Sequence, residues 1–505
     1  MQTGHDNSTE VLATLGDSIA AGRPLAVASD GAANTPRTRW PEWTALCLFA
    51  AIVASAIPFH EPWTDEALAW QLARSLSLRS LFGTYLGYET SPGLWHFLLW
   101  GMIRAHIGYT GLHWICGAIA FAASALLLFA SPLPRALRLT LPFTYFLLFQ
   151  YAVIARSYVL APLFLFLIAL GWRKSPLLMA ILLGLLANVS LHTAVISGAL
   201  AIVYLLREMR RSANRRQFAA FAAIVAAFYA FAIWTAWPPH DLRLAQTPGQ
   251  ARPVLLFAVI SLFWGICEPW ILSIPFWIAI ALCLHARRSV VFLLPVLFFV
   301  AFSGVVYVQF WHMGLLVPLV ISLLWITWPD SPRAPARYEL AGSIAMFCMI
   351  AVQLAWAGFA LVYDHNHDYS GNTAAAEFLK PYVRANATIV VTYIDHPRDQ
   401  SSNAVGILPY FDRNIFANWS YPFWRWSERN TTEQNYLSLL PSHPRIVMVE
   451  AHPLRPDATV DLHHPKIEQL TRMGYRFTNS FCGGAPERLE VAFSSCHLIF
   501  QYAGP

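Results

Sequence analysis

Asp65 and Glu66 are the residues in this sequence best placed to do chemistry, because they are adjacent carboxylates directly after the first long apolar segment. Charges beside a membrane segment are costly to place in apolar surroundings, so their presence needs a reason. A carboxylate at the membrane edge can take the proton of an acceptor hydroxyl. We therefore predict a catalytic pair with Asp65 as general base, although the same two residues could simply cap a helix.

Further polar residues fall at the same predicted membrane edge, although they come from loops far apart in the chain. An arginine among them could neutralise a leaving phosphate through paired hydrogen bonds. Two of these residues could instead have purely structural roles, since His96 could be an ordinary surface histidine and Arg156 could anchor a helix end. The residues predicted to bind substrate are Glu89, His96, Arg104, Arg156, Tyr158, His192, Glu268 and His312, with Asp241 beside them.

The composition places the chain in the membrane class. Hydrophobic residues make up 57% of the sequence and charged residues 12%, with a mean hydropathy of +0.47. That is too apolar for an ordinary soluble protein. No basic face with interleaved aromatics is present, so we expect no nucleic-acid partner. Cys482 and Cys496 lie in a polar C-terminal region and could pair in an oxidising compartment.

The elements that must position these residues are apolar helices. We predict about eleven transmembrane helices with the N-terminus in the cytoplasm, because this threading places most Lys and Arg in cytoplasmic loops. The segment 93–106 is too short to span and is predicted to be an external interfacial helix, as is the stretch 253–263. The predicted spans are 43–59, 112–130, 139–155, 157–172, 176–190, 193–206, 218–237, 265–284, 290–308, 313–328 and 340–363.

Three regions follow from this threading. Residues 1–41 read as a disordered cytoplasmic tail, residues 42–363 as the membrane domain and residues 364–505 as an extracytoplasmic α/β domain. In the last region we predict a helix at 373–379 and strands at 388–394, 445–450 and 491–500. The catalytic pair and the C-terminal domain are thus predicted to lie outside a cytoplasmic (inner) membrane that the chain crosses many times.

The order of these motifs resembles the GT-C superfamily of integral membrane glycosyltransferases. It is similar to the bacterial branch related to protein O-mannosyltransferases and aminoarabinose transferases. An Asp-Glu pair follows the first span, Ser91-Pro92-Gly93 opens an external helix where a double proline is commoner, and Ala155-Arg156-Ser157-Tyr158 forms a turn two spans later. The resemblance implies that Asp65 is the catalytic first-loop aspartate, that Glu66 helps to hold the acceptor, and that Arg156 lies near the donor phosphate.

The function that the resemblance implies is inverting transfer of a sugar from a polyprenyl-phosphate donor to a glycan, lipid or protein acceptor among the membrane lipids. Glu66 or Glu89 would orient the acceptor, and Arg104 or His312 would assist Arg156. Some members use a divalent cation, so Mg²⁺ or Mn²⁺ on Asp65 and Glu66 stays open. The carrier tail is expected among the early spans, near the aromatics Trp63, Trp95 and Trp100.

Three other functions stay open. A glycan ligase or polymerase that uses lipid diphosphate-linked substrates would concentrate Arg and His in a long late loop, whereas carboxylates dominate an early loop here. A lipid or sugar transporter would show more ionisable groups inside the spans. A scaffold that binds a partner through its C-terminal domain would not need Asp65.

Overall fold

The computed structural model describes residues 38–208, 214–240, 253–328, 336–394, 403–423, 429–451 and 463–504. The predicted disordered tail therefore lies almost wholly outside the described residues. The chain divides into two compact units, Met1–Trp43 and Thr44–Pro505.

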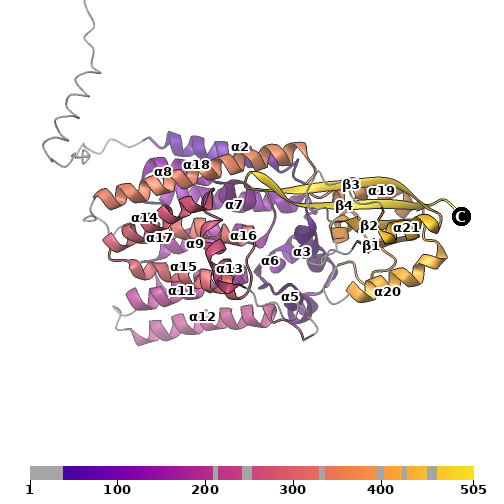
Figure 1. Cartoon of the computed structure of the whole chain (residues 1–505). Coiled ribbons are helices and arrows are strands. Elements are labelled where there is room, and N and C mark those ends of the chain that lie inside the picture. The colour runs from indigo at the N-terminus through magenta and orange to yellow at the C-terminus, as the bar shows by residue number, and fades with distance from the viewer. Residues whose placement is uncertain are drawn as a thin grey trace, which may run out of the picture. The chain divides into compact units, whose positions relative to one another are not determined.

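The second unit is mostly helical as far as residue 366 (Figure 1). Apolar residues dominate these helices, and several are buried against one another in one large core. The helices are α2 (Trp40–Ala56), α3 (Thr64–Ser75), α4 (Leu78–Ser80), α5 (Leu86–Glu89), α6 (Leu94–Arg104), α7 (Gly111–Ala130), α8 (Arg135–Thr140), α9 (Leu160–Gly171), α10 (Pro176–Ala187), α11 (Leu191–Arg207), α12 (Arg215–Ala236), α13 (Val254–Phe263), α14 (Ser273–Ala286), α15 (Leu294–Val305), α16 (Phe310–Met313), α17 (Leu316–Thr327) and α18 (Ala336–Asn366).

Four helical segments are long and apolar enough to cross a membrane by length and composition: Gly111–Ala130, Arg215–Ala236, Phe310–Thr327 and Arg337–Asn366. Other apolar helices, such as Pro176–Ala187, are shorter. The short helix predicted at 93–106 is α6, whose 11 residues reach about 16 Å at 1.5 Å per residue. The structure thus has the helical character of a membrane protein, with four candidate spans among the residues it describes.

The predicted span at 139–155 is wrong as a single helix. After α8 the backbone tightens into a 3₁₀ turn at Leu141–Phe143 and then a π turn at Phe146–Gln150. Pro142 lies in the first turn, where it has no N–H to donate and its ring clashes with the carbonyl four residues earlier. The break leaves Ala155 and Arg156 outside any helix, which frees both to face the acidic residues of α3.

The C-terminal region is a four-stranded mixed sheet with three helices. The strands are β1 (Ile389–Tyr393), β2 (Ile446–Ala451), β3 (Tyr475–Glu487) and β4 (Glu490–Tyr502), in the order β1-β2-β4-β3. β1 and β2 are parallel, and the other two pairs are antiparallel. The helices are α19 (Asn372–Arg384), α20 (Arg429–Leu439) and α21 (Pro465–Arg472). The sequence had predicted β1, β2, β4 and α19, but not β3, α20 or α21.

Strands β1 and β2 are buried on both faces of the sheet, as their apolar runs require. Val447 and Val449 face a core that includes α20 and α21. Ile446 and Met448 point the other way, into a second core. The second core also contains Leu68 and Leu72 of α3, so the sheet packs against the helix that carries the acidic pair. Figure 1 shows α3, α5 and α6 between the long helices and the sheet.

The hairpin of β3 and β4 makes a further connection to the helical region. Tyr145 Oη lies 3.1 Å from the carbonyl oxygen of Pro486. Arg488, at the turn, pairs with Glu268 at 3.7 Å. Along the hairpin, Cys482 and Cys496 are cross-strand partners and are joined by a disulfide bond.

Candidate active site

Asp65 and Arg156 form an ion pair, with 2.6 Å between Asp65 Oδ2 and Arg156 Nη1. Asp65 is in the first turn of α3, and Arg156 is in the extended stretch before the helical segment that starts at Ser157. The two side chains are 37% and 19% exposed. The structure therefore brings together the predicted base and the predicted phosphate ligand, and it leaves the carboxylate accessible.

Aromatic rings surround the guanidinium of Arg156. Its Cζ lies 5.5 Å from the ring centre of Trp63, 5.4 Å from that of Tyr158 and 5.2 Å from that of Trp311. Burial disfavours the charge, but Asp65 and other nearby acidic groups raise the pKa of Arg156 above its usual value. The result is a fixed cation held by cation–π contacts in a place with little water.

Glu89 is a second carboxyl group near this pair. It ends α5 and is partly buried. Burial and the charge of Asp65 raise the pKa of Glu89 to about 8, and Arg156 offsets only part of this shift. Glu89 is thus protonated at neutral pH while Asp65 is paired with a cation. Two carboxyl groups in different protonation states are the arrangement from which acid and base roles can be assigned.

Tyr158, His312 and His192 form a linked group on the other side of Arg156. Tyr158 Oη is 2.6 Å from His312 Nε2, and His312 Nδ1 accepts the backbone N–H of Gln309 at 2.9 Å. A neutral His312 therefore carries its proton on Nε2 and donates it to Tyr158. The ring of His192 stacks on that of His312 with 4.1 Å between ring centres, while His192 Nε2 lies 3.0 Å from the carbonyl of Tyr307. All three predicted residues are therefore close to Arg156.

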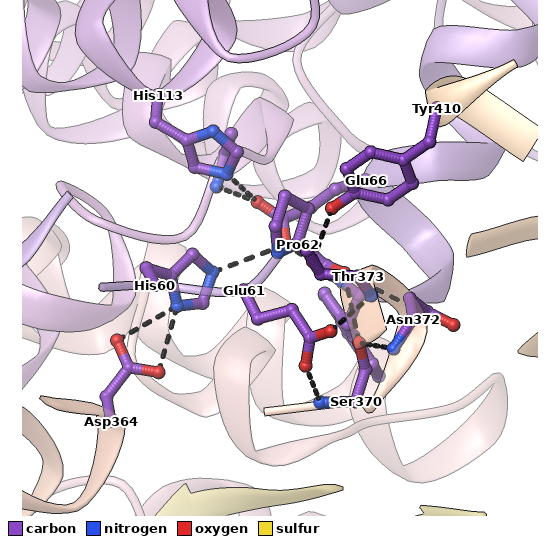
Figure 2. A network of polar contacts seen from close by, with 12 residues as sticks. His60, Glu61, Pro62, Glu66, His113, Asp364, Ser370, Asn372, Thr373 and Tyr410 are labelled. Carbon is purple, nitrogen blue, oxygen red and sulfur yellow. Dashed lines mark hydrogen bonds and ion pairs between the residues drawn. The ribbon is translucent and has the colours of Figure 1, made fainter. Parts of the chain in front are cut away.

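Glu66 is buried, at 1% exposed, and Figure 2 shows its carboxylate directed at His60 and His113. Its carboxylate accepts backbone N–H groups from Trp63 at 3.0 Å and from Ala155 at 2.5 Å. Burial would raise the pKa of Glu66, but His113 and His60 hold it well below its usual range. The predicted catalytic role for Glu66 is thus not what its contacts support. It positions the backbone on either side of the Asp65–Arg156 pair.

His60 and His113 converge on Glu66, as Figure 2 shows. His113 Nε2 is 2.9 Å from Glu66 Oε1, and His60 Nε2 is 3.5 Å from Oε2. On its other side His60 Nδ1 contacts the carboxylate of Asp364 at 3.0 and 3.1 Å. Burial lowers the pKa of His60, but Asp364 and Glu66 outweigh it and raise that pKa to about 10. The two carboxylates of Asp364 and Glu66 therefore favour a positive charge on the group between them.

Glu61 connects the same loop to the C-terminal region. Its carboxylate accepts the backbone N–H groups of Ser370 and Gly371, each at 2.7 Å, and of Thr373 at 2.6 Å. These N–H groups lie at the start of α19, where a helix leaves donors without intrahelical partners and carries partial positive charge. Figure 2 shows this cap beside the His60 cluster. The loop that precedes Asp65 is therefore fixed by the sheet region as well as by the apolar helices.

Three predicted residues do not join the site. His96 is buried in α6, and burial lowers its pKa to about 4, so it is neutral and cannot act as a cation toward phosphate. Arg104 is exposed at the end of α6 and lies over the ring of Trp100. Glu268 pairs with Arg488 of the hairpin. Asp241 lies outside the described residues.

A metal is better suited to a different set from the one predicted. Asp65 directs one carboxylate oxygen at Arg156, and Glu66 lies in a separate buried cluster. Within the described residues, the group whose donor atoms could hold an ion is His60, Glu66 and His113.

The sequence reasoning missed His60, Glu61, His113, Asp364 and Trp311. The first two could have been found, because His60-Glu61 is a polar pair just before Asp65 at the end of an apolar segment. The other three carry no local signal. His113 and Trp311 belong to apolar helices, and Asp364 follows a long apolar run, so only the folded chain places them at the site.

Comparison with models of known protein families, with curated proteins and with solved structures finds no match for this chain.

Proposed function

We propose that this chain is a membrane glycosyltransferase of the GT-C type. It moves a sugar from a polyprenyl-phosphate donor to an acceptor at the outer face of the cytoplasmic membrane, with inversion. The observation that carries the proposal is the Asp65–Arg156 pair, in which an accessible carboxylate lies 2.6 Å from a cation enclosed by aromatic rings. A base and an anion site side by side are what transfer from a lipid phosphate needs.

In the proposed reaction Asp65 takes the proton of the acceptor hydroxyl. Its Oδ2 is engaged by Arg156, so Oδ1 is the atom that receives the proton. The acceptor oxygen forms a bond to the anomeric carbon of the sugar while the bond from that carbon to the phosphate oxygen breaks. The electron pair leaves with the polyprenyl phosphate. Attack from the face opposite the leaving group inverts the anomeric configuration.

Arg156 stabilises the phosphate that leaves. A guanidinium has five N–H donors, so pairing with Asp65 leaves donors for phosphate oxygens. Because aromatic rings already hold the cation in place, little reorganisation is needed as negative charge develops. Tyr158 Oη accepts a hydrogen bond from His312 Nε2–H, which leaves its own hydroxyl hydrogen free to donate to the same phosphate.

Glu89 orients the acceptor. As a protonated acid it donates a hydrogen bond to an acceptor oxygen without competing with Asp65 for the transferred proton. Glu66 supports the reaction indirectly, through the backbone N–H of Ala155 beside Arg156.

The carrier tail is assigned to an apolar hollow between the segment after α4 and the end of α12. The hollow is lined by Gly83, Thr84, Tyr88, Trp234 and Trp237. Tyr88 precedes Glu89, so this hollow lies next in sequence to the site. Of the aromatics Trp63, Trp95 and Trp100 that were expected near the tail, Trp95 fits less well, since it is only 3% exposed in the core.

The proposal includes the full threading. About eleven crossings would place the N-terminus in the cytoplasm and the region after α18 outside. In support, the described residues contain several shorter apolar helices besides the four long ones. The same threading puts the disulfide of Cys482 and Cys496 in an oxidising compartment, where such bonds persist.

The test is a strain that lacks this protein, examined by mass spectrometry of its envelope glycans, lipids and proteins. A sugar missing from one class of molecule, restored by the wild type and not by Asp65→Asn, would support the proposal and identify the acceptor. Full restoration by Asp65→Asn would overturn it. A lipid or sugar flux that survives Asp65→Asn would favour a transporter instead.

A further inference from the structure

His60, Glu66 and His113 come from three separate segments and place their donor atoms together. His60 follows α2, Glu66 is in the first turn of α3, and His113 is near the start of α7. One ligand atom from each lies within 4.8 Å of the others, and all three residues are buried. The transfer reaction proposed above uses Asp65 and Arg156, and it gives His60 and His113 no role.

The donor set and its spacing fit zinc. Two imidazoles and one carboxylate are a common protein ligand set for this ion. Ligands 2.0–2.1 Å from a tetrahedral centre are about 3.3 Å apart. The contacts to Glu66 are 2.9 Å from His113 Nε2 and 3.5 Å from His60 Nε2. The three donor atoms lie within 4.8 Å of one another, so the two imidazoles must draw closer together to share an ion with the carboxylate, and they release their protons to do so.

The surroundings of these ligands are those of a built metal site. Asp364 contacts His60 Nδ1 with both carboxylate oxygens, at 3.0 and 3.1 Å, which turns Nε2 toward Glu66. A carboxylate on the far nitrogen of a histidine ligand is the usual outer contact of a zinc site. Backbone N–H groups of Trp63 and Ala155 fix the orientation of Glu66.

A buried tyrosine lies beside one of these ligands. Tyr109 packs beside His113, with 6.5 Å between ring centres, and is buried. Its hydroxyl has no hydrogen-bond partner within the part of the chain that the structure describes. A buried hydroxyl without a partner is costly. A water bound to the metal would supply that partner and complete a tetrahedral set.

Charge balance points the same way. Glu66 and Asp364 bring two negative charges into an enclosed space, whereas the charge of Glu61 is already met by the start of α19. One divalent cation with two neutral imidazoles balances them. We propose that His60, Glu66 and His113 bind one divalent transition-metal ion, zinc by donor chemistry, and that this ion holds the loop before Asp65 against α7 and α18.

The test measures metal in the full-length protein purified in detergent. Elemental mass spectrometry after dialysis against zinc and then metal-free buffer should find about one zinc per chain. The variants His60→Asn and His113→Asn should hold less than a tenth of that amount. His96→Asn is the matched control, because His96 is also buried but lies outside the cluster, and it should keep its zinc.

Two further measurements keep the proposal testable if a ligand variant does not fold. Asp364→Asn should weaken zinc binding about 10–100-fold, and a strong chelator should lower the melting temperature of the wild type, with recovery on adding zinc. The proposal is overturned if the wild type retains no more metal than His113→Asn, or if His96→Asn loses metal equally. It is also overturned if the chelator leaves the melting temperature unchanged.

Discussion

Replacement of Asp65 by Asn separates the chemistry of this site from its stability. Asn has nearly the same shape and still presents an oxygen to Arg156, but it cannot take a proton. A positioned general base contributes about 10²–10⁴-fold to rate, which corresponds to about 3–5 kcal/mol in the activation barrier. The sugar-transfer rate of Asp65→Asn should therefore fall by at least about 100-fold.

The stability cost should be much smaller. The ion pair is only partly buried, with Asp65 37% exposed, and exposed pairs contribute about 0.2–1 kcal/mol. The melting temperature should therefore change by a few degrees at most. A large fall in transfer rate with a small change in melting temperature would show that Asp65→Asn acts on the reaction and not through unfolding.

The assay follows transfer of labelled sugar from its polyprenyl phosphate to the acceptor identified in the complementation experiment, in membranes with equal amounts of protein. Glu377→Gln is the control, because Glu377 on α19 is 61% exposed and pairs with its helix neighbour Lys380. It should keep the wild-type rate. An Asp65→Asn rate within threefold of wild type would refute the assignment of Asp65 as the base.

Four other perturbations test the remaining parts of the site and fold. Arg156→Lys keeps the charge but loses the planar donors, so the transfer rate should fall roughly 100-fold with little change in melting temperature; a loss below threefold would contradict the phosphate role. Burial and Asp65 raise the pKa of Glu89 from 4.5 to about 8, so its neutral form is lost as pH rises through about 8. The rate should decline over that interval, and Glu89→Gln, neutral at every pH, should remove the decline in a pH–rate profile. Glu61→Gln removes a charge that accepts three backbone N–H groups of the α19 start and should cost about 2–3 kcal/mol, seen as a lower melting temperature; an unchanged value would contradict this. Replacing both Cys482 and Cys496 with Ser removes a cross-link between residues 14 apart in the sequence and should lower the free energy of unfolding by about 3 kcal/mol. A reducing agent should lower the free energy of unfolding of the wild type by the same amount and leave that of the variant unchanged.

The membrane character of the chain and the place of its helices could be predicted from sequence, because an apolar run long enough to matter is a local property. The predicted 112–130 is observed as α7, and 218–237 as α12. The short segment at 93–106 was likewise predicted as a helix, and α6 is one. The same reasoning failed at 139–155, because apolar composition does not reveal where a chain with Pro142 will leave the helix.

The candidate site was predicted in part. Asp65 and Arg156 are 91 residues apart in the sequence. The order of the motifs predicted that both belong to one site, and the ion pair shows that their side chains are in contact. The role of Glu66 could not be read from its position, because adjacent residues on a helix point in different directions. Asp65 points to the opening, while Glu66 points to His60, His113 and the backbone of Ala155.

The amino-acid sequence is enough to show which segments are apolar and that a carboxylate pair follows the first of them. Which of the two carboxylates is accessible depends on the folded chain, because their partners come from distant segments. Asp364 is 304 residues from His60 and Ser370 is 309 residues from Glu61, and no local pattern encodes such pairs. Burial and hydrogen bonding, which set protonation and reach, are properties of the packed chain, because they arise where separate helices and loops meet.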